Sequence, residues 1–310
     1  MITLQHANID SMHRLAWRYQ LMNKTVFTGV CTALVTPFLD GKVNYPMFQQ
    51  LIRRQMEAGI KALVICGTTG EAPTLTDSEK IELVRYAKAC AGDRCKIIAG
   101  TGSNSTQHAV ELSIAAQNAG ADAVLVVSPY YNKATAEGLF AHYLSIAHAI
   151  KIPVILYNVP SRTGVDIPVS VYKRLSSVPN IAGVKEAGAD ITKIAKIRNA
   201  CGQDLCIWSG NDDMIVPVMS MGGQGVISTL SNVCPVETAA MAEAALAGDF
   251  DTAADLQCRM QPLIDLLFCE VNPIPVKAAM KKIGYDCGGY RLPLTPLSKE
   301  NQLRLDAYFA

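Results

Sequence analysis

The chain has 310 residues, of which 50% are hydrophobic and 18% are charged, and its formal charge is +1. A chain this apolar is not disordered, and it is long enough to bury one large core. Its 28 lysines and arginines balance 27 aspartates and glutamates, so its charge predicts no nucleic-acid and no acidic-membrane partner. Its long apolar runs, such as 121–127, fall short of the ~18 residues that a membrane helix needs.

Residues 1–26 do not follow the pattern of the rest of the chain, and we expect them to lie outside the catalytic fold. The segment Met12 to Met22 is compatible with a short amphipathic helix and equally with a disordered leader. One hypothesis is that translation naturally starts at Met22. It would be contradicted if N-terminal sequencing of the natively expressed protein found Met1 or Ile2.

Eight apolar runs predict eight parallel strands. Most of these runs do not alternate with polar residues, which is typical of strands covered by helices on both faces. They begin near Val30, Ala62, Lys96, Asp122, Pro153, Ile181, Leu205 and Gln224.

Segments with helical spacing separate the strands, at 47–57, 77–90, 106–119, 134–150, 168–177 and 191–200. Thr76 and Glu79 have the spacing of a capping box at the start of the second segment. Eight strand–helix units favour a closed (β/α)8 TIM barrel over residues 27–231. No strand pattern follows Ser228, so residues 232–310 are predicted as a C-terminal helical region, with helices at 235–248, 251–267 and 275–283.

Ten cysteines are spread along the chain, and no two have the C-x-x-C spacing of zinc or redox sites. Several, such as Cys66 and Cys206, lie inside apolar runs, where a thiol behaves as a small hydrophobic group. Residues 1–26 also lack the continuous apolar core of a secretory leader. We therefore expect reduced thiols and a cytoplasmic location.

Catalytic groups of β/α barrels gather at the carboxyl ends of the strands, which makes Lys185 the first candidate. It directly follows an apolar run, so its amine should emerge inside the barrel mouth, lose hydration and attack a carbonyl to form a Schiff base. The alternative is a lysine that reaches outward to solvent or pairs with Glu186.

Three further strand ends carry candidate groups. Tyr157 can act as a general acid and base, or it can be a packed tyrosine. Thr68 and Thr69, between glycines, can hold a carboxylate, or their loop can be a simple tight turn. Arg162 offers a bidentate site for a second carboxylate, or it can be a solvated arginine.

Other chemistries fit less well. The five histidines are at positions 6, 13, 108, 142 and 148, none at a predicted strand end, which disfavours a metal-dependent aldolase. No G-x-S-x-G suggests a serine hydrolase, and no Gly-Lys-Ser/Thr marks a phosphate-binding loop. Gly100 and Gly102 begin a dinucleotide fingerprint, but Ser105 occupies its third-glycine position. We expect no metal and no organic cofactor.

Three motifs together resemble the pyruvate-dependent class I aldolase and lyase superfamily: 67–71 (GTTGE), 157–160 (YNVP) and 183–186 (GVKE). The resemblance runs from about Phe27 to the C-terminus and includes 272–277 (NPIPVK). Residues 129–132 (PYYN) and 161–164 (SRTG) are similar to the dihydrodipicolinate synthases, which use the arginine for an aldehyde's carboxylate; the sialic acid lyases lack it. A lyase that cleaves a 2-keto-3-deoxy sugar acid or N-acetylneuraminate stays open as the alternative. A catalytically inactive metabolite-binding barrel is disfavoured, because Lys185, Tyr157 and Thr69 are present together.

The resemblance implies substrates and residue roles. Lys185 would form an imine with pyruvate, and the derived enamine would attack aspartate semialdehyde. Tyr157 would transfer protons in a relay with Thr69 and with Tyr131, which is contributed by a neighbouring subunit of a homotetramer, a dimer of dimers. Thr68, Thr69 and the main chain at Ile227 would hold the pyruvate carboxylate. Arg162, Gly210 and Asn211 would serve the second substrate.

Two departures from the family pattern have consequences. Asn211 stands where the family often has an aspartate, which alters polarity near the second substrate. In the lysine-feedback pocket, Asn104 and Tyr130 match, but Lys80 replaces a histidine and His108 replaces a glutamate. Because a carboxylate is lost and a positive charge is added, we expect weak or absent inhibition by lysine.

Overall fold

The computed structural model describes residues 25–310. The predictions for Met12 to Met22, and for Met22 as the natural start, lie outside the described residues.

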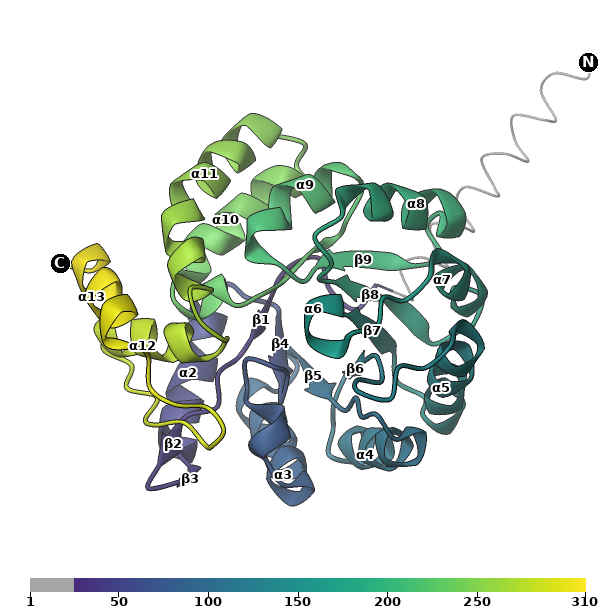
Figure 1. Ribbon diagram of the computed structural model, residues 1–310, viewed down its shortest axis with the longest axis horizontal. Helices are drawn as coiled ribbons and strands as arrows, with labels where there is room; N and C mark the ends of the chain where they lie inside the picture. The colour runs from purple at the N-terminus through teal and green to yellow at the C-terminus, as the bar shows by residue number, and fades with distance from the viewer. Residues whose placement is uncertain (1–24) are drawn as a thin grey trace, which may run out of the picture.

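Eight parallel strands close into a barrel in which each strand pairs with its neighbours and β1 pairs with both β4 and β10 (Figure 1). The strands are β1 (Gly29–Ala33), β4 (Ala62–Ile65), β5 (Lys96–Gly100), β6 (Ala123–Val127), β7 (Val154–Asn158), β8 (Ile181–Glu186), β9 (Cys206–Ser209) and β10 (Gly225–Ser228). The predicted (β/α)8 TIM barrel with additional C-terminal helices is confirmed, and each strand begins within one residue of its predicted start.

Helices surround the barrel and cover the outer face of its strands. They are α2 (Tyr45–Glu57), α3 (Asp77–Ala91), α4 (Thr106–Asn118), α5 (Ala136–Ala149), α7 (Val169–Leu175), α8 (Ile191–Cys201), α9 (Ile215–Ser220) and α10 (Pro235–Leu246). The capping box of α3 is confirmed, since the Glu79 amide donates to Thr76 Oγ1 at 3.2 Å and the Thr76 amide donates to Glu79 Oε2 at 2.9 Å.

Several short elements were not predicted. They are the hairpin β2 (Phe38–Leu39) and β3 (Lys42–Val43), α6 (Pro160–Thr163), α9, α13 (Lys299–Tyr308), and the 3₁₀ turns η1 (Ala72–Thr74), η2 (Asp212–Met214) and η3 (Leu230–Asn232). Leu305 is the one buried residue of α13. A helix with so little buried surface has no apolar stripe to recognise.

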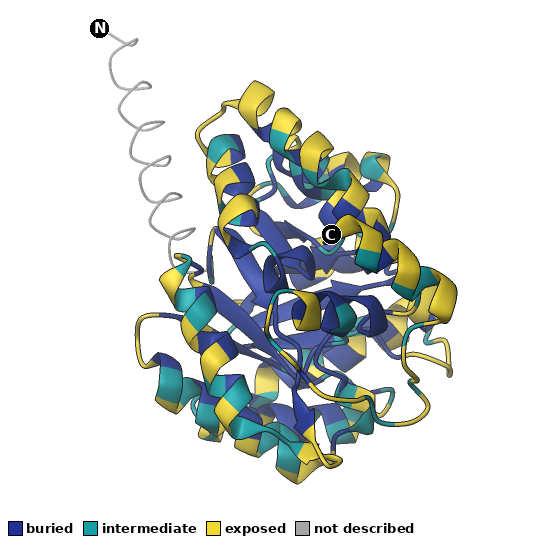
Figure 2. Cartoon of the chain, turned by 90° about the vertical axis from the view of Figure 1, so that its left-hand side faces the viewer, coloured by how far each residue is buried: buried dark blue, intermediate teal, exposed yellow. Residues whose placement is uncertain are grey.

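Figure 2 shows the buried strands at the centre and exposed residues along the outer faces of the helices. The barrel interior holds its own apolar cluster, in which Phe27 stacks on Trp208 with ring centroids 4.9 Å apart. Gly225 sits where β10 meets β1, at φ +146°, and a Cβ there would lie 1.8 Å from the Gly29 carbonyl oxygen. Only glycine allows the barrel to close at this point.

Within the predicted C-terminal region 232–310, α10 packs against β1 of the barrel, and α11 (Phe250–Leu267), α12 (Ile274–Lys282) and α13 follow it. The helix α11 packs against α10 and α9. A connecting segment, 284–297, returns to the barrel, where the Phe38 amide donates to the Cys287 carbonyl oxygen at 2.9 Å. The predicted boundary between residues 231 and 232 stays a prediction. Within residues 25–310, no helix is long and apolar enough to cross a membrane.

Candidate active site

Lys185 and Tyr157 are neighbours across the β7–β8 pair, where their Cα atoms are in register. Each residue is only 6% exposed, and Lys185 Nζ lies 4.5 Å from the centroid of the Tyr157 ring. An amine held against the face of an aromatic ring at a strand end lies inside the barrel mouth. The alternative of an outward-reaching lysine does not fit this burial.

Glu186 does not pair with Lys185. Its Oε1 atom accepts from the Asn158 amide group at 2.7 Å and from the Gly188 amide at 2.8 Å. Its Oε2 atom accepts from the Tyr172 hydroxyl at 3.1 Å and lies 3.5 Å from Lys193 Nζ. Among residues 25–310, Lys185 Nζ has no salt bridge or hydrogen bond, and the face of the Tyr157 ring is its cation–π partner.

Thr68 and Thr69 lie in a tight turn that follows β4. The Gly70 amide donates to the Gly67 carbonyl at 3.1 Å, and the Glu71 amide donates to the Thr68 carbonyl at 3.1 Å. Thr69 is 2% exposed, and its Oγ1 atom lies 3.3 Å from Thr229 Oγ1 at the end of β10. The turn after β4 thus places the Thr69 hydroxyl against the Thr229 hydroxyl, which follows β10.

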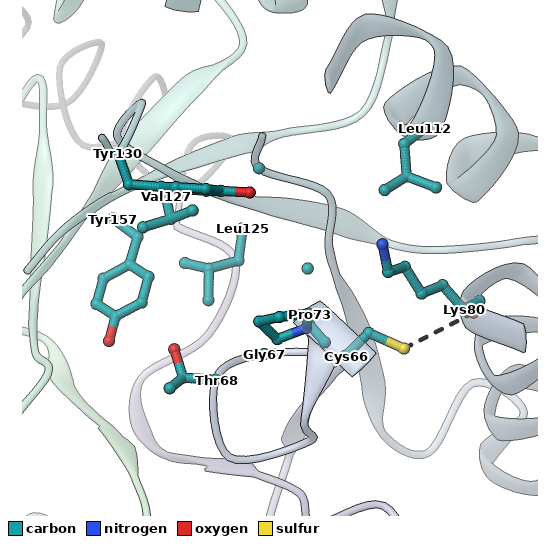
Figure 3. Close-up of a pocket in the computed structure, with 13 residues that line it drawn as sticks. Cys66, Gly67, Thr68, Pro73, Lys80, Leu112, Leu125, Val127, Tyr130 and Tyr157 are labelled. Atoms are coloured by element: carbon teal, nitrogen blue, oxygen red, sulfur yellow. Dashed lines mark hydrogen bonds between the residues drawn. The ribbon is translucent and has the colours of Figure 1, made fainter. Parts of the chain in front are cut away.

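A pocket opens between this turn and β6, as Figure 3 shows. Thr68 and Tyr157 both line it, and their hydroxyl groups point toward the same space. Tyr130, Lys80 and Cys66 line the pocket as well. The structure therefore brings Lys185, Tyr157, Thr68 and Thr69 to one end of the barrel.

Arg162 is exposed on α6, two residues after Pro160, and its Nη2 atom lies 3.4 Å from the carbonyl oxygen of Asn272. Asn272 also donates from Nδ2 to Thr69 Oγ1 at 2.9 Å. The sequence reasoning did not assign a role to Asn272. In the sequence, Asn272 is distinguished only by lying in the segment 272–277, which is part of the family resemblance.

The remaining predicted residues follow β9 and β10. Ile227 is buried in β10, and Gly210 and Asn211 form the partly exposed turn after β9. The next residue, Asp212, was missed. Its Oδ2 atom accepts from the amides of Thr229 at 3.0 Å and Leu230 at 2.8 Å, and burial raises its pKa. Asp212 thereby fixes Thr229, the neighbour of Thr69.

Tyr131 is not brought into the site within one chain. Its side chain is 90% exposed, and its backbone has a positive φ of 73°. A large aromatic side chain this exposed is unusual, because aromatic residues normally bury most of their surface.

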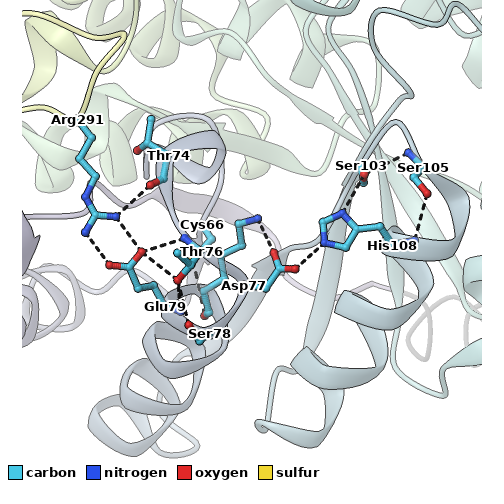
Figure 4. Close-up of polar contacts among 11 residues, drawn as sticks. Cys66, Thr74, Thr76, Asp77, Ser78, Glu79, Ser103, Ser105, His108 and Arg291 are labelled. Carbon is cyan, nitrogen blue, oxygen red and sulfur yellow. Dashed lines mark hydrogen bonds and ion pairs between the residues drawn. The ribbon is translucent and has the colours of Figure 1, made fainter.

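Lys80 and His108 both pair with the carboxylate of Asp77, and Figure 4 shows Asp77 beside His108. Lys80 Nζ lies 3.1 Å from Asp77 Oδ1, and His108 Nε2 lies 2.7 Å from Asp77 Oδ2. The second ring nitrogen of His108 lies 3.2 Å from Ser103 Oγ. Asp77 therefore already has two partners, and its hydrogen bond with His108 is the main cause that lowers its pKa.

The ten cysteines form no disulfide, and burial raises the pKa of Cys66 and of Cys95 to about 12. Such thiols stay protonated and behave as hydrophobic groups. Among residues 25–310, no three histidine, cysteine, aspartate or glutamate side chains are grouped as metal ligands would be.

Comparison with known proteins gives a consistent result. The family model described as the dihydrodipicolinate synthetase family matches residues 26–309. The 4-hydroxy-tetrahydrodipicolinate synthase of Thermoanaerobacter sp. (strain X514) is 47% identical over 277 residues, which cover 89% of this chain and 93% of the relative. That of Acetivibrio thermocellus is 46% identical over 280 residues, covering 90% and 95%.

Solved structures agree with the sequence comparison. The dihydrodipicolinate synthase of Aquifex aeolicus superposes with a TM-score of 0.89 at 42% identity, covering 91% of this chain and 97% of that one. The enzyme of Acinetobacter baumannii, solved with pyruvate, gives a TM-score of 0.89 at 41% identity over the same shares. The chain belongs to the dihydrodipicolinate synthetase family.

Proposed function

We propose that this protein is a Schiff-base lyase that condenses pyruvate with L-aspartate 4-semialdehyde to 4-hydroxy-tetrahydrodipicolinate, in lysine biosynthesis by the diaminopimelate route. The observation that carries the proposal is the buried amine of Lys185 against the ring of Tyr157, with Thr68 and Thr69 at the same barrel end. The names of the relatives support the choice of reaction.

The reaction begins when the neutral Lys185 amine attacks the ketone carbon of pyruvate and water leaves, which gives an iminium ion. The iminium withdraws electrons, so the neighbouring methyl group loses a proton and an enamine forms. No metal or organic cofactor is required for this step. Tyr157 carries the protons, in a relay with Thr69.

The enamine carbon then attacks the aldehyde carbon of the second substrate. The amino group of that substrate attacks the iminium carbon, which closes the ring and releases the Lys185 amine. Both substrates carry a carboxylate, so the site needs two anion-binding groups. Thr68, Thr69 and the main chain at Ile227 serve pyruvate, and Arg162 serves the semialdehyde, with Gly210 and Asn211 beside it.

Borohydride reduction tests the covalent step. Incubation with pyruvate and borohydride should add one reduced pyruvate to the wild-type protein, as read by intact mass. Lys185→Ala should show no gain, while Lys196→Ala, an exposed lysine on α8, should behave as wild type. A wild-type protein without an adduct would favour a metabolite-binding barrel.

Acceptor choice is tested at Arg162. Arg162→Ala should abolish turnover of aspartate semialdehyde yet leave the pyruvate adduct intact. Arg174→Ala removes an exposed arginine that pairs with Glu137, and it should leave turnover unchanged. Efficient cleavage of a 2-keto-3-deoxy sugar acid or N-acetylneuraminate by both wild type and Arg162→Ala would instead establish the alternative lyase.

We further propose a cytoplasmic homotetramer in which Tyr131 enters the site of a neighbouring subunit. Its 90% exposure in the single chain supports this role. Sedimentation should give a tetramer, and mixing inactive Tyr131→Phe and Lys185→Ala subunits should restore activity. Restoration fails if Tyr131 acts within its own chain.

A further inference from the structure

Each of the two proposed catalytic residues is followed by a polar residue that faces away from the barrel interior. Asn158 follows Tyr157 at the end of β7, and Glu186 follows Lys185 at the end of β8. Successive side chains of a strand point to opposite faces, so these two followers face the surrounding helices. Asn158 and Glu186 are in register, and Asn158 Nδ2 donates to Glu186 Oε1 at 2.7 Å. This hydrogen bond joins the two strand ends from the outside.

Asn158 also closes the segment that carries Arg162. The chain leaves β7 at Asn158, forms α6 and returns, and there the Ile167 amide donates to Asn158 Oδ1 at 3.0 Å. Asn158 Nδ2 donates a second time, to Asp166 Oδ1 at 2.8 Å. The side chain of Asn158 is buried, and its amide nitrogen and oxygen both have partners. The segment 159–167 is therefore a loop whose two ends are held by one side chain.

A buried lysine on α8 holds the same loop from the other side. Lys193 Nζ donates to Asp166 Oδ1 and lies 3.5 Å from Glu186 Oε2. The side chain of Lys193 is 10% exposed, whereas that of Asp166 is 58% exposed. Asp166 is thus a surface residue whose carboxylate accepts from two buried donors, Asn158 and Lys193. Through Asp166 the loop is tied both to the end of β7 and to α8.

The loop 159–167 is also bonded internally. Thr163 is buried, and its Oγ1 atom lies 3.1 Å from the Val159 carbonyl oxygen and 3.0 Å from the Val165 carbonyl oxygen. The Val165 amide donates back to Thr163 Oγ1 at 3.2 Å. Arg162 directly precedes Thr163 on α6, so a movement at the base of the loop carries Arg162 with it.

We infer that Asp166 is a positioning residue that sets where Arg162 meets the carboxylate of the second substrate. It does so by fastening the loop 159–167 to Asn158 and Lys193. The inference rests on the proposed function, in which Arg162 binds the semialdehyde. It adds to that function a residue that touches neither substrate and acts on only one of them. The residues proposed for pyruvate lie outside this loop, so the chemistry of pyruvate should not depend on Asp166.

Separate measurements on the two substrates test this inference. Asp166→Ala should raise the KM for aspartate semialdehyde about tenfold, because a displaced Arg162 makes a weaker charge-assisted hydrogen bond to the carboxylate. The exchange of pyruvate methyl hydrogens for deuterium in D₂O measures enamine formation without any aldehyde, and it should match wild type, as should the borohydride adduct. Asp204→Ala is the matched control, since Asp204 is exposed in the turn between α8 and β9, and it should change neither measurement.

Asp166→Asn separates the hydrogen bonds of Asp166 from its charge. Asparagine keeps the shape and the acceptor oxygen, so the bonds from Asn158 and Lys193 still form. The KM of Asp166→Asn for the semialdehyde should therefore stay near that of wild type. A role in stability alone predicts that Asp166→Ala slows pyruvate exchange as much as it slows condensation.

The outcomes separate the two proposals. If wild type exchanges pyruvate hydrogens and condenses the semialdehyde, but Asp166→Ala keeps the wild-type KM or loses both activities equally, the inference is wrong while the Schiff-base lyase stands. The inference is also wrong if Asp166→Asn is as impaired as Asp166→Ala. If wild type shows neither exchange nor adduct, the proposed function itself fails. An unfolding midpoint of Asp166→Ala equal to that of Asp204→Ala excludes a global folding defect as the cause.

Discussion

Replacing Lys277 by methionine should destabilise the protein strongly, because it leaves a buried carboxylate without its partner. Lys277 and Glu71 have side-chain exposures of 1% and 0%. The lysine also donates to the carbonyl oxygens of Thr36 at 3.2 Å and Gly289 at 2.6 Å. Burial lowers the pKa of Lys277, and the charge of Glu71 opposes this shift.

The size of the stability loss depends on the Glu71 carboxylate that stays buried when Lys277 is replaced. Methionine keeps most of the apolar volume of the lysine stem, so little packing is lost. Glu71 keeps a hydrogen bond from the Arg291 amide at 3.3 Å but loses its cation. Breaking one side of a buried ion pair costs about 3–5 kcal/mol. For a chain of this size, that lowers the unfolding midpoint on the order of 10 °C.

Urea and thermal unfolding measure the effect, with Lys281→Met as the control. Lys281 pairs with Asp286 at 2.9 Å, but its side chain is 69% exposed, so the control should lose no more than about 1 kcal/mol. The double variant Lys277→Met/Glu71→Gln removes both charges and should be more stable than Lys277→Met. The prediction is wrong if Lys277→Met is as stable as Lys281→Met. It is also wrong if the double variant loses as much stability as Lys277→Met and Glu71→Gln lose together when each is measured alone.

Three other predictions concern titratable groups away from Lys185. Arg291 donates to Glu79 and lowers the pKa of the Glu79 carboxyl to about 2. This ion pair therefore stabilises the fold above pH 4.5, and its stabilisation is lost as the pH falls toward 2. The variant Arg291→Gln should be less stable to unfolding at pH 7, and its stability should fall less than that of wild type between pH 4.5 and pH 2. Burial lowers the pKa of His142 to about 4, so as the pH falls the unfolded chain binds this proton before the folded chain does. The free energy of unfolding of wild type should therefore fall by up to about 3 kcal/mol between pH 6.5 and pH 4. This contribution should be absent from His142→Gln. Asp77 already binds Lys80 and His108, so millimolar lysine should leave the condensation rate unchanged in a coupled assay, whereas half-inhibition below millimolar lysine would contradict this.

The barrel was predictable because its signals are local. Each strand is an unalternated apolar run, and each long helix shows an apolar stripe or a cap such as Thr76 with Glu79. Elements that lack such signals were missed. The helix α13 buries only Leu305, and the hairpin β2–β3 has two residues in each strand.

The candidate site was predictable to the same degree, and for a related reason. In a β/α barrel the position of a residue at a strand end is enough to place it at the mouth, so Lys185 and Tyr157 follow from the strand pattern. Their contact, with the Lys185 amine over the Tyr157 ring, requires only that β7 and β8 are neighbours. The strand pattern does not predict the role of Asp212, because Asp212 accepts a hydrogen bond from the Thr229 backbone amide and does not line the pocket.

Asn272 lies beyond the reach of such reasoning, since 203 residues separate it from Thr69. Nothing in the local pattern of 272–277 indicates which barrel loop it meets. The meeting depends on how α11 and α12 pack and on the Lys277–Glu71 pair, which spans 206 residues. The C-terminal helical region, which the sequence pattern separates from the barrel, therefore supplies a hydrogen bond to the turn that holds Thr68 and Thr69. The Lys277–Glu71 ion pair and the Asn272–Thr69 hydrogen bond both belong to the contact between this region and the turn after β4.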